Sequence, residues 1–292
     1  MKIAYLDTAS GIAGDMTLAA LVDAGASQEY LQKQINSLGV PSIELQFSET
    51  HRGGFRALRL DIKHPAEHEH RNLQQIERLI DSSNLTDRER DLALRIFRRL
   101  GQAEARVHGM PLEQVHFHEV GAIDSIVDII GVAIAISQLG IERLFASPTP
   151  TGTGFVTIAH GTVSVPAPAT AELLKGIPIR SSKIEAELTT PTGAAILASL
   201  VDDFGPLPAM KLSSIGYGAG HKDFPTQANL LRVMIGDSSD WSNTHDSATR
   251  SDHHSHDHHS HDHHSHDHHS HDHHSHDHHS HDHHSHDHDH GH

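Results

Sequence analysis

The segment 115–136 combines side chains that bind metals with a strongly apolar run. His116 and His118 are two residues apart, so an extended backbone would direct both imidazoles to the same side. Glu119 follows on the opposite side unless the chain turns at once, and Gly121 permits such a turn. Together these side chains offer nitrogen and oxygen ligands for a divalent cation.

The apolar run at residues 123–136 predicts a helix that is buried nearly all round. At about 100° per residue, one stripe of this helix collects small and polar residues, namely Gly121, Asp124, Asp128 and Gly131, with Ser125 at its edge. Two carboxylates one turn apart are costly to bury without a partner. A divalent cation, a basic side chain or backbone amides must therefore pair with them.

Taken singly, these residues have a simpler interpretation. Asp124 could cap the helix, Asp128 could bond to neighbouring backbone, and the histidines could be half-buried polar residues. As a set they favour a metal site, because five ligand-type side chains lie within a few residues: His116, His118, Glu119, Asp124 and Asp128. The chain has no cysteine, which excludes thiolate ligands and disulfides. Imidazole with carboxylate suits nickel, zinc and copper, whereas the two aspartates suit Mg better.

Two glycine-bearing turns that precede helices are candidate anion sites, because the amides of a first helical turn point at whatever lies there. The first follows a strand at residues 2–6 and contains Ser10, Gly11, Gly14 and Asp15. The second contains Thr190, Thr192 and Gly193, before a helix at residues 194–201. Neither is a Walker loop or a dinucleotide fingerprint. A tight strand-to-helix turn, ordinary helix capping, or a cation between Asp7 and Asp15 explains them equally well.

Two further residues lie in glycine-rich or proline-rich surroundings. His160 stands between two short predicted strands and could be another ligand, a proton carrier or a plain loop residue. Residues 216–223 are dense in glycine and predict a turn between strands at 210–215 and 230–235. Lys222 in that turn could contact an anion.

The remaining pattern predicts an α/β fold, a mixed sheet with packed helices, with α+β as the alternative. Ser27 caps a helix ending near residue 38, and two strands at 43–47 and 55–62 join through a glycine turn. Helices at 73–81 and 87–107 follow a histidine-bearing linker at 63–71. Thr86 and Glu89 form a capping box for the second helix, and residues 143–146 form a strand.

The formal charge of -16 over 292 residues is concentrated at one end. From Asp237 onward there are twelve Asp, no Glu, and one basic residue, Arg250, which leaves residues 1–236 with a net charge of -5. This body has no basic patch for a nucleic-acid backbone. We find neither a secretory signal nor an apolar run long enough for a bilayer, so a cytoplasmic protein without membrane association is expected.

Residues 237–292 form a second segment that differs in composition from the body, residues 1–236. From Ser251 the sequence repeats Asp-His-His-Ser-His with a period of five. Such a tract cannot bury apolar surface and is expected to be disordered without metal. Its imidazoles, for example those of His253, His254, His256 and His258, can bind borderline cations near neutral pH. An engineered tag is the alternative, but the interleaved Asp and Ser and the length favour a native metal store.

Residues 1 to about 236 resemble the N-terminal portion of the LarC family, the nickel insertion proteins of nickel-pincer cofactor biosynthesis. The motifs that carry the resemblance occur in the family's order at residues 5–16, 116–128, 159–161, 166–168, 190–193 and 216–218. Members of that family also carry His-rich segments of varying length and place.

The resemblance implies a nickel chelatase, a cyclometallase of the lyase class. It would insert Ni(II) into pyridinium-3,5-bisthiocarboxylic acid mononucleotide, forming Ni–S and Ni–C bonds, with CTP and Mg or Mn to activate the substrate. The product would serve a lactate racemase-type apoenzyme. The family's C-terminal domain with the CTP site has no counterpart here, and the His tract stands in its place. One alternative is that this portion is encoded as a separate chain, for example through a frameshift. The other is that this protein keeps only a nickel-handling role.

We therefore expect His116, His118, Glu119, Asp124 and Asp128, joined by His160, to hold a divalent metal. The turns at residues 10–15 and 190–193 would contact the substrate's phosphate, and the tail would collect nickel. The rival hypothesis is a non-catalytic nickel store or metallochaperone. A phosphate-ester hydrolase using Asp7 and Asp15 ranks below both, and a homo-oligomer is compatible with the sequence.

Overall fold

The computed structural model describes residues 1–40, 42–65, 71–117 and 121–238. Two predicted metal ligands, His118 and Glu119, and all tail histidines lie outside the described residues. Met1–Arg250 forms one compact unit, which is described here by itself.

The main sheet has seven strands in the order β2-β3-β10-β11-β1-β4-β9. It is mixed, because β1 pairs antiparallel with β11 and parallel with β4. The strands are β1 Lys2–Asp7, β2 Glu44–Arg52, β3 Phe55–Lys63, β4 Arg143–Ala146, β9 Asp203–Phe204, β10 Lys211–Ala219 and β11 Leu230–Asp237. Two small sheets pair β5 Thr149–Pro150 with β8 Ile179–Arg180 and β6 Phe155–Ile158 with β7 Gly161–Ser164.

The described residues form seven α-helices and a short 3-10 helix. The bounds are α1 Gly14–Asp23, α2 Gln28–Asn36, α3 Leu73–Asp81, α4 Asp87–His108, α5 Ile123–Gln138, α6 Pro168–Leu173, α7 Pro191–Leu200 and the 3-10 helix Leu112–Gln114. The predicted mixed α/β class is confirmed. No helix in the part of the chain that the structure describes is both long and apolar enough to cross a membrane.

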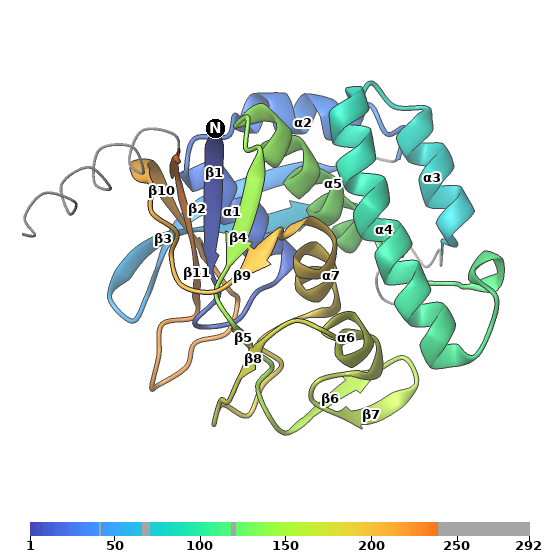
Figure 1. Cartoon of the computed structure of the whole chain (residues 1–292). Coiled ribbons are helices and arrows are strands. Elements are labelled where there is room, and N and C mark those ends of the chain that lie inside the picture. Colours follow the sequence, from blue (N-terminus) through green and yellow to red (C-terminus); the bar gives the residue numbers. More distant parts are fainter. Residues whose placement is uncertain (41, 66–70, 118–120, 239–292) are drawn as a thin grey trace, which may run out of the picture. The chain divides into compact units, whose positions relative to one another are not determined.

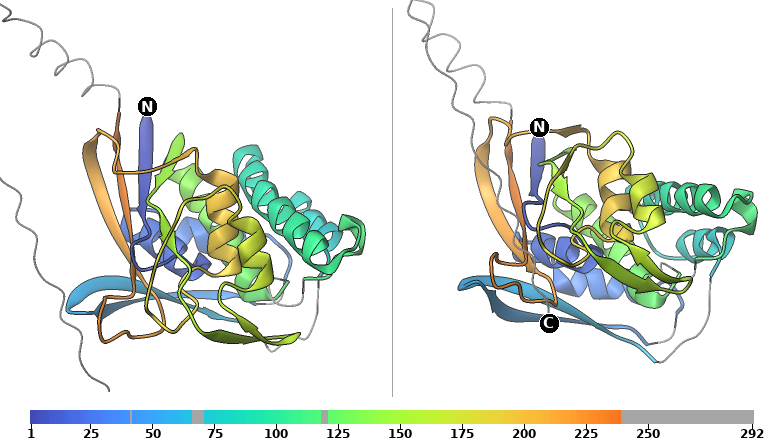
Figure 2. Two further views of the ribbon diagram at one scale, coloured as in Figure 1. Left: turned by 60° about the horizontal axis from the view of Figure 1, so that its bottom comes forward. Right: turned by 90° about the horizontal axis from the view of Figure 1, so that it is seen from below.

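The helices gather on one side of the sheet in layers (Figures 1 and 2). Helix α1 packs on β10, β3 and β11, and α5 packs on the far side of α1. Helix α4 in turn covers α5, α6 and α7. The apolar run predicted as a buried helix is α5, whose residues from Ile126 to Ile136 are all buried. This arrangement sandwiches α1 between the sheet and α5.

Glycine on α5 sets how closely α1 and α5 approach. A Cβ added to Gly131 would lie 2.4 Å from Leu18 Cδ2, so any side chain there would require Leu18 on α1 to move. One turn earlier on the same face, Asp128 meets Gly14 at the start of α1, where an added Cβ would lie 2.7 Å from Asp128 Cβ. The predicted small-and-polar stripe is therefore the face that α5 turns toward α1, and it brings a carboxylate to the first residue of that helix.

The predicted turn at residues 216–223 was wrong for its first half, because Gly216–Ala219 lies inside strand β10. These glycines let the strand pack directly under α1. A Cβ on Gly216 would lie 2.0 Å from the carbonyl oxygen of Ala20, and one on Gly218 would lie 1.9 Å from that of Met16. The connection between β10 and β11 therefore begins only at Gly220 and contains Lys222. Helix α7 likewise begins at Pro191, earlier than predicted, because proline suits a first helical turn.

Candidate substrate and metal site

The two turns predicted as anion sites lie side by side in the structure. The Ile12 amide donates to the Leu188 carbonyl (2.9 Å), and the Thr190 amide donates to the Ile12 carbonyl (3.0 Å). The Gly14 amide donates to Thr192 Oγ1 (3.3 Å). The first turns of α1 and α7 are therefore fixed against each other, although the residues are about 180 positions apart in the sequence.

Several predicted substrate-binding residues hold this junction together. A Cβ on Gly11 would lie 2.1 Å from the Leu188 carbonyl oxygen, and one on Gly193 would lie 2.2 Å from that of Ile12. Ser10 Oγ donates to the Ala228 carbonyl (2.7 Å). Thr190 is the N-cap of α7 and accepts from the Gly193 amide (3.2 Å). Helix capping and close packing thus account for these four residues.

Two hollows meet at the junction and share Ala13, Asp15 and Thr190 as lining residues. One has a volume of 210 Å³ and adds His221 and Lys222 from the β10–β11 connection. The other has a volume of 260 Å³ and adds Ser125 and Asp128 from α5. Each alone is smaller than the roughly 300–1,000 Å³ of typical ligand pockets, and the shared wall allows one ligand to span both.

Asp128 is a buried carboxylate with an unsatisfied oxygen. The residue is 9% exposed, and its Oδ1 has no hydrogen-bond partner among the described residues. Burial raises the pKa of Asp128 well above its ordinary value, and the negative charges of Asp15 and Asp124 raise it further, while the Asp15 amide acts in the opposite direction. Neighbouring backbone therefore does not satisfy this oxygen, and a proton or a cation is needed there.

Asp15 also contacts a histidine that the sequence gave no reason to pair with it. His221 Nε2 lies 3.3 Å from Asp15 Oδ2. The hydrogen bond to Asp15 raises the pKa of His221. The hollow toward the β10–β11 connection is lined by His221 and Lys222 together with Asp15 and Glu187, whereas the hollow toward α5 has, among its described lining residues, only the carboxylates of Asp15 and Asp128 as charged groups.

Asp124 lies in the first turn of α5 but does not cap it, because Ala122 is the N-cap. Its Oδ1 lies 3.0 Å from Nε2 of His64, the first residue after β3. The Asp124 side chain is 60% exposed. The interpretation of Asp124 as the helix cap was wrong, and the carboxylate instead extends the acidic region around Asp128, whose pKa it raises.

The two described histidines among the predicted metal ligands lie in other places. His116 is exposed beside the fully buried Phe117 and forms an isolated antiparallel bridge with Asn72. His160 lies beside His108, with ring centroids 4.8 Å apart. In the described ranges no group of three or more His, Asp or Glu side chains is arranged to hold a metal ion. The charges of Asp15 and Asp124 thus act on Asp128, whereas His160 lies beside His108.

Three histidines of the site region were not among the predicted site residues: His108, His221 and His64, which was assigned to the linker at 63–71. Each meets its partner through contacts between elements distant in the sequence, except that His108 also lies one helical turn after Glu104 on α4. That Glu-x-x-x-His spacing was the only local signal available. The pairs Asp15–His221 and Asp124–His64 require knowledge of the fold.

Comparison with known proteins agrees with the resemblance. The model of a family described as nickel insertion protein matches residues 4–280. A putative nickel insertion protein of Rhodopirellula baltica is 52% identical over 237 residues, which are 81% of this chain and 60% of the relative. One of Citrifermentans bemidjiense is 51% identical over 241 residues, 82% of this chain and 63% of the relative.

A third relative, of Staphylococcus epidermidis, is named pyridinium-3,5-bisthiocarboxylic acid mononucleotide nickel insertion protein. It is 50% identical over 233 residues, 80% of this chain and 59% of the relative. The chain thus spans about 60% of the length of the curated relatives it matches. No solved structure matches the chain. Because the family model covers nearly the whole sequence and half of the aligned residues are identical, the chain belongs to the nickel insertion protein family.

Proposed function

We propose that this chain provides the nickel-inserting part of a nickel chelatase, a cyclometallase of the lyase class, acting on pyridinium-3,5-bisthiocarboxylic acid mononucleotide. Relatives from Staphylococcus epidermidis and Geobacillus kaustophilus carry this substrate in their names. The observation that carries the proposal is the buried Asp128 carboxylate, with its unsatisfied oxygen, on the wall of a hollow at the meeting point of two helix N-termini.

The charges around the hollows suit both reactants. Asp128, Asp15 and Asp124 favour a divalent cation on the α5 side. Lys222 and the His221 side chain, whose pKa is raised, favour the phosphate of a mononucleotide in the other hollow, which Glu187 also lines. The N-terminal ends of α1 and α7 lie at the wall that both hollows share and favour an anion there. A substrate lying across the shared wall would place its phosphate near Lys222 and its pyridinium ring near Asp128.

Insertion of nickel into the ring needs a proton acceptor. Forming a Ni–C bond at a ring carbon breaks that carbon's C–H bond, and the proton must leave as Ni(II) takes up the electron pair. A carboxylate whose pKa is raised by burial is a stronger base than an exposed one. Asp128 has that property and is the residue we assign to proton removal.

The proposal includes partners that this chain does not contain. CTP with Mg or Mn would act through the family's C-terminal portion, supplied as a separate chain, and the metallated product would pass to a lactate racemase-type apoenzyme. Residues 1–236 would be the inserting body, and residues 237–292 would collect Ni(II). His116, His118 and Glu119 stay candidate ligands for nickel at the start of α5.

The direct test combines the chain with the C-terminal portion of a relative, the mononucleotide, CTP, Mg and Ni(II). Mass spectrometry should detect the product with nickel gained and a proton lost from the ring. Asp128→Asn should lower the rate by about 100-fold or more, in the range of lost general-base catalysis. Asp91→Asn, which changes an exposed carboxylate on α4 outside the two hollows, is the control and should leave the rate unchanged. A full rate with Asp128→Asn would remove Asp128 from the chemistry.

The histidine content of the tail favours a second function. Twenty-five of the 34 histidines follow Asp237, which suits a nickel store or metallochaperone without catalysis. A chain ending at Arg250, given the same C-terminal portion, CTP and saturating Ni(II), distinguishes the two. Product formation by this shortened chain supports insertion. Nickel binding by the full chain, with no product from either chain, would favour the store.

A further inference from the structure

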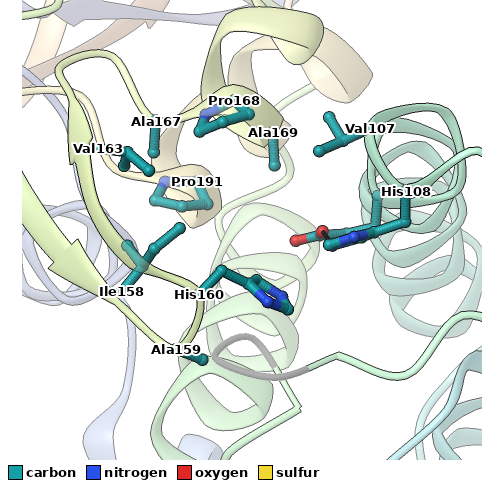
Figure 3. A pocket seen from close by; sticks show the side chains of 11 residues that line it. Val107, His108, Ile158, Ala159, His160, Val163, Ala167, Pro168, Ala169 and Pro191 are labelled. Carbon is teal, nitrogen blue, oxygen red and sulfur yellow. Dashed lines mark ion pairs between the residues drawn. The ribbon is translucent and has the colours of Figure 1, made fainter.

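A third hollow lies between the C-terminal end of α4 and the β6–β7 hairpin (Figure 3). Its walls are mainly apolar, with two imidazoles and one carboxylate on one side. His108 is the last residue of α4, where Gly109 ends the helix in the left-handed conformation. His160 occupies the turn between β6 and β7, before Gly161 with a φ of 105°. Both histidines are thus held at the ends of regular elements and point toward each other.

These side chains lie close together, although in their present rotamers the described side chains form no ready-made three-ligand group. The His108 and His160 rings have centroids 4.8 Å apart and are tilted by 54°. Glu104 Oε2 lies 3.4 Å from His108 Nε2. Two ligands at about 2.1 Å on adjacent positions of one ion are about 3 Å apart. Small side-chain rotations would therefore bring two nitrogens and one oxygen onto a single ion.

The environment of the three side chains also favours a borderline metal over Mg. The side chains of Glu104 and His108 are only 15% and 23% exposed, and Val107, Ile158 and Val163 line the same hollow. Imidazole nitrogen suits Ni(II), Cu(II) and Zn(II), whereas Mg prefers oxygen and water.

The hollow adjoins the acidic one. Pro191, the first residue of α7, lines both this hollow and the one that contains Asp15 and Asp128. The two hollows are therefore neighbours that share Pro191 as a wall residue.

We propose that His108 and His160, with Glu104, form a nickel-receiving site that passes the ion to the Asp15 and Asp128 hollow. The assignment deepens the proposed nickel insertion and rests on it for the identity of the metal. In this site His160 shares the ion with His108 and not with the ligands of the 116–128 segment. The site also adds Glu104 and His108, which no sequence motif had singled out.

Histidine footprinting of the full chain tests this site without substrate, CTP or turnover. Ni(II) is added beyond the capacity of the tail, the protein is modified with diethyl pyrocarbonate, and peptide mass spectrometry reads each histidine. A nitrogen bound to nickel cannot be acylated, so modification of His108 and His160 should fall by about tenfold. His51, exposed on β2, is the internal control and should react as before. Mg should protect none of them.

If His108 and His160 bind the same ion, the protection of each histidine must depend on the other. His108→Asn should abolish the protection of His160, and His160→Asn should abolish that of His108, while His51→Asn should leave both protected. Because His160 lies in an exposed turn, its variant tests the proposal even if the His108 variant unfolds. Protection of one histidine that survives loss of the other, or no protection by nickel, overturns the site. The chain can pass this test and still fail to insert nickel, so the two proposals fail separately.

Discussion

At Asp128, stability of the fold and the proposed chemistry have opposite requirements. Its burial against Gly14 and its unpaired Oδ1 raise its pKa, so the folded protein favours the protonated carboxyl more than the unfolded chain does. Between the ordinary pKa near 3.8 and the raised one, the folded state binds more protons, and stability falls as pH rises through that interval. Above that interval the ionised carboxylate of Asp128 opposes folding unless a cation binds.

Asp128→Asn should therefore stabilise the metal-free chain at pH 7. The amide has the same shape without the charge, and relief of the buried charge should amount to about 1 kcal/mol or more, an increase of about 2–4 °C in Tm. Thermal unfolding from pH 3.5 to 8 is the measurement, and the variant's advantage should shrink toward acid pH. Asp124→Asn should change Tm little, because that side chain is 60% exposed. A less stable Asp128→Asn at neutral pH would show that the carboxylate is satisfied in solution.

Local sequence signals predicted the helices and strands well where capping and periodicity act alone. The capping boxes at Asn72–Gln75 and Thr86–Glu89 are both formed, the latter as predicted, and α5 begins at Ile123 as expected. The prediction failed at Gly216–Ala219, because a glycine-dense turn and a glycine-dense strand under a helix look alike in sequence.

The sequence predicted the two turns of the site separately, but not that they meet. That the Gly14 and Thr192 turns meet, and that His221 reaches Asp15, depends on sheet order and on α1 packing beneath α5.

The contact between α1 and β10 should not tolerate a side chain on the strand. Gly218→Ala would place a Cβ 1.9 Å from the Met16 carbonyl oxygen in the first turn of α1. Displacing backbone on this scale should cost about 3 kcal/mol or more, measured as the free energy of unfolding in urea. Because α1 carries Asp15, insertion activity should fall with it. Gly205→Ala is the matched control, since an added Cβ meets nothing within 4 Å there, and equal destabilisation by both variants would contradict this packing.

At the scale of the whole molecule, the proposed function would divide the handling of nickel between the body and the tail. The body offers few candidate ligands around Asp128 and His160, whereas the tail offers many equivalent imidazoles in a five-residue repeat. Many weak sites tethered to one body raise the local concentration of the ion without any new contact. Such tethering matters only when free nickel is scarce, so it should affect the nickel requirement of the reaction and not its maximal rate.

Shortening the chain to Met1–Arg250, the compact unit, should therefore shift nickel dependence alone. At pH 7.5 most tail imidazoles are neutral, since their ordinary pKa is about 6.5, and the full chain should reach half its maximal insertion rate at about tenfold less nickel than the shortened one. At saturating nickel the two rates should agree. Below about pH 6 the tail histidines are protonated and cannot bind, so the advantage should vanish there while the acidic hollow keeps its own pH dependence. Nickel titrations of both chains in a metal-buffered assay measure this, and identical curves at pH 7.5 would deny the tail a role in supply.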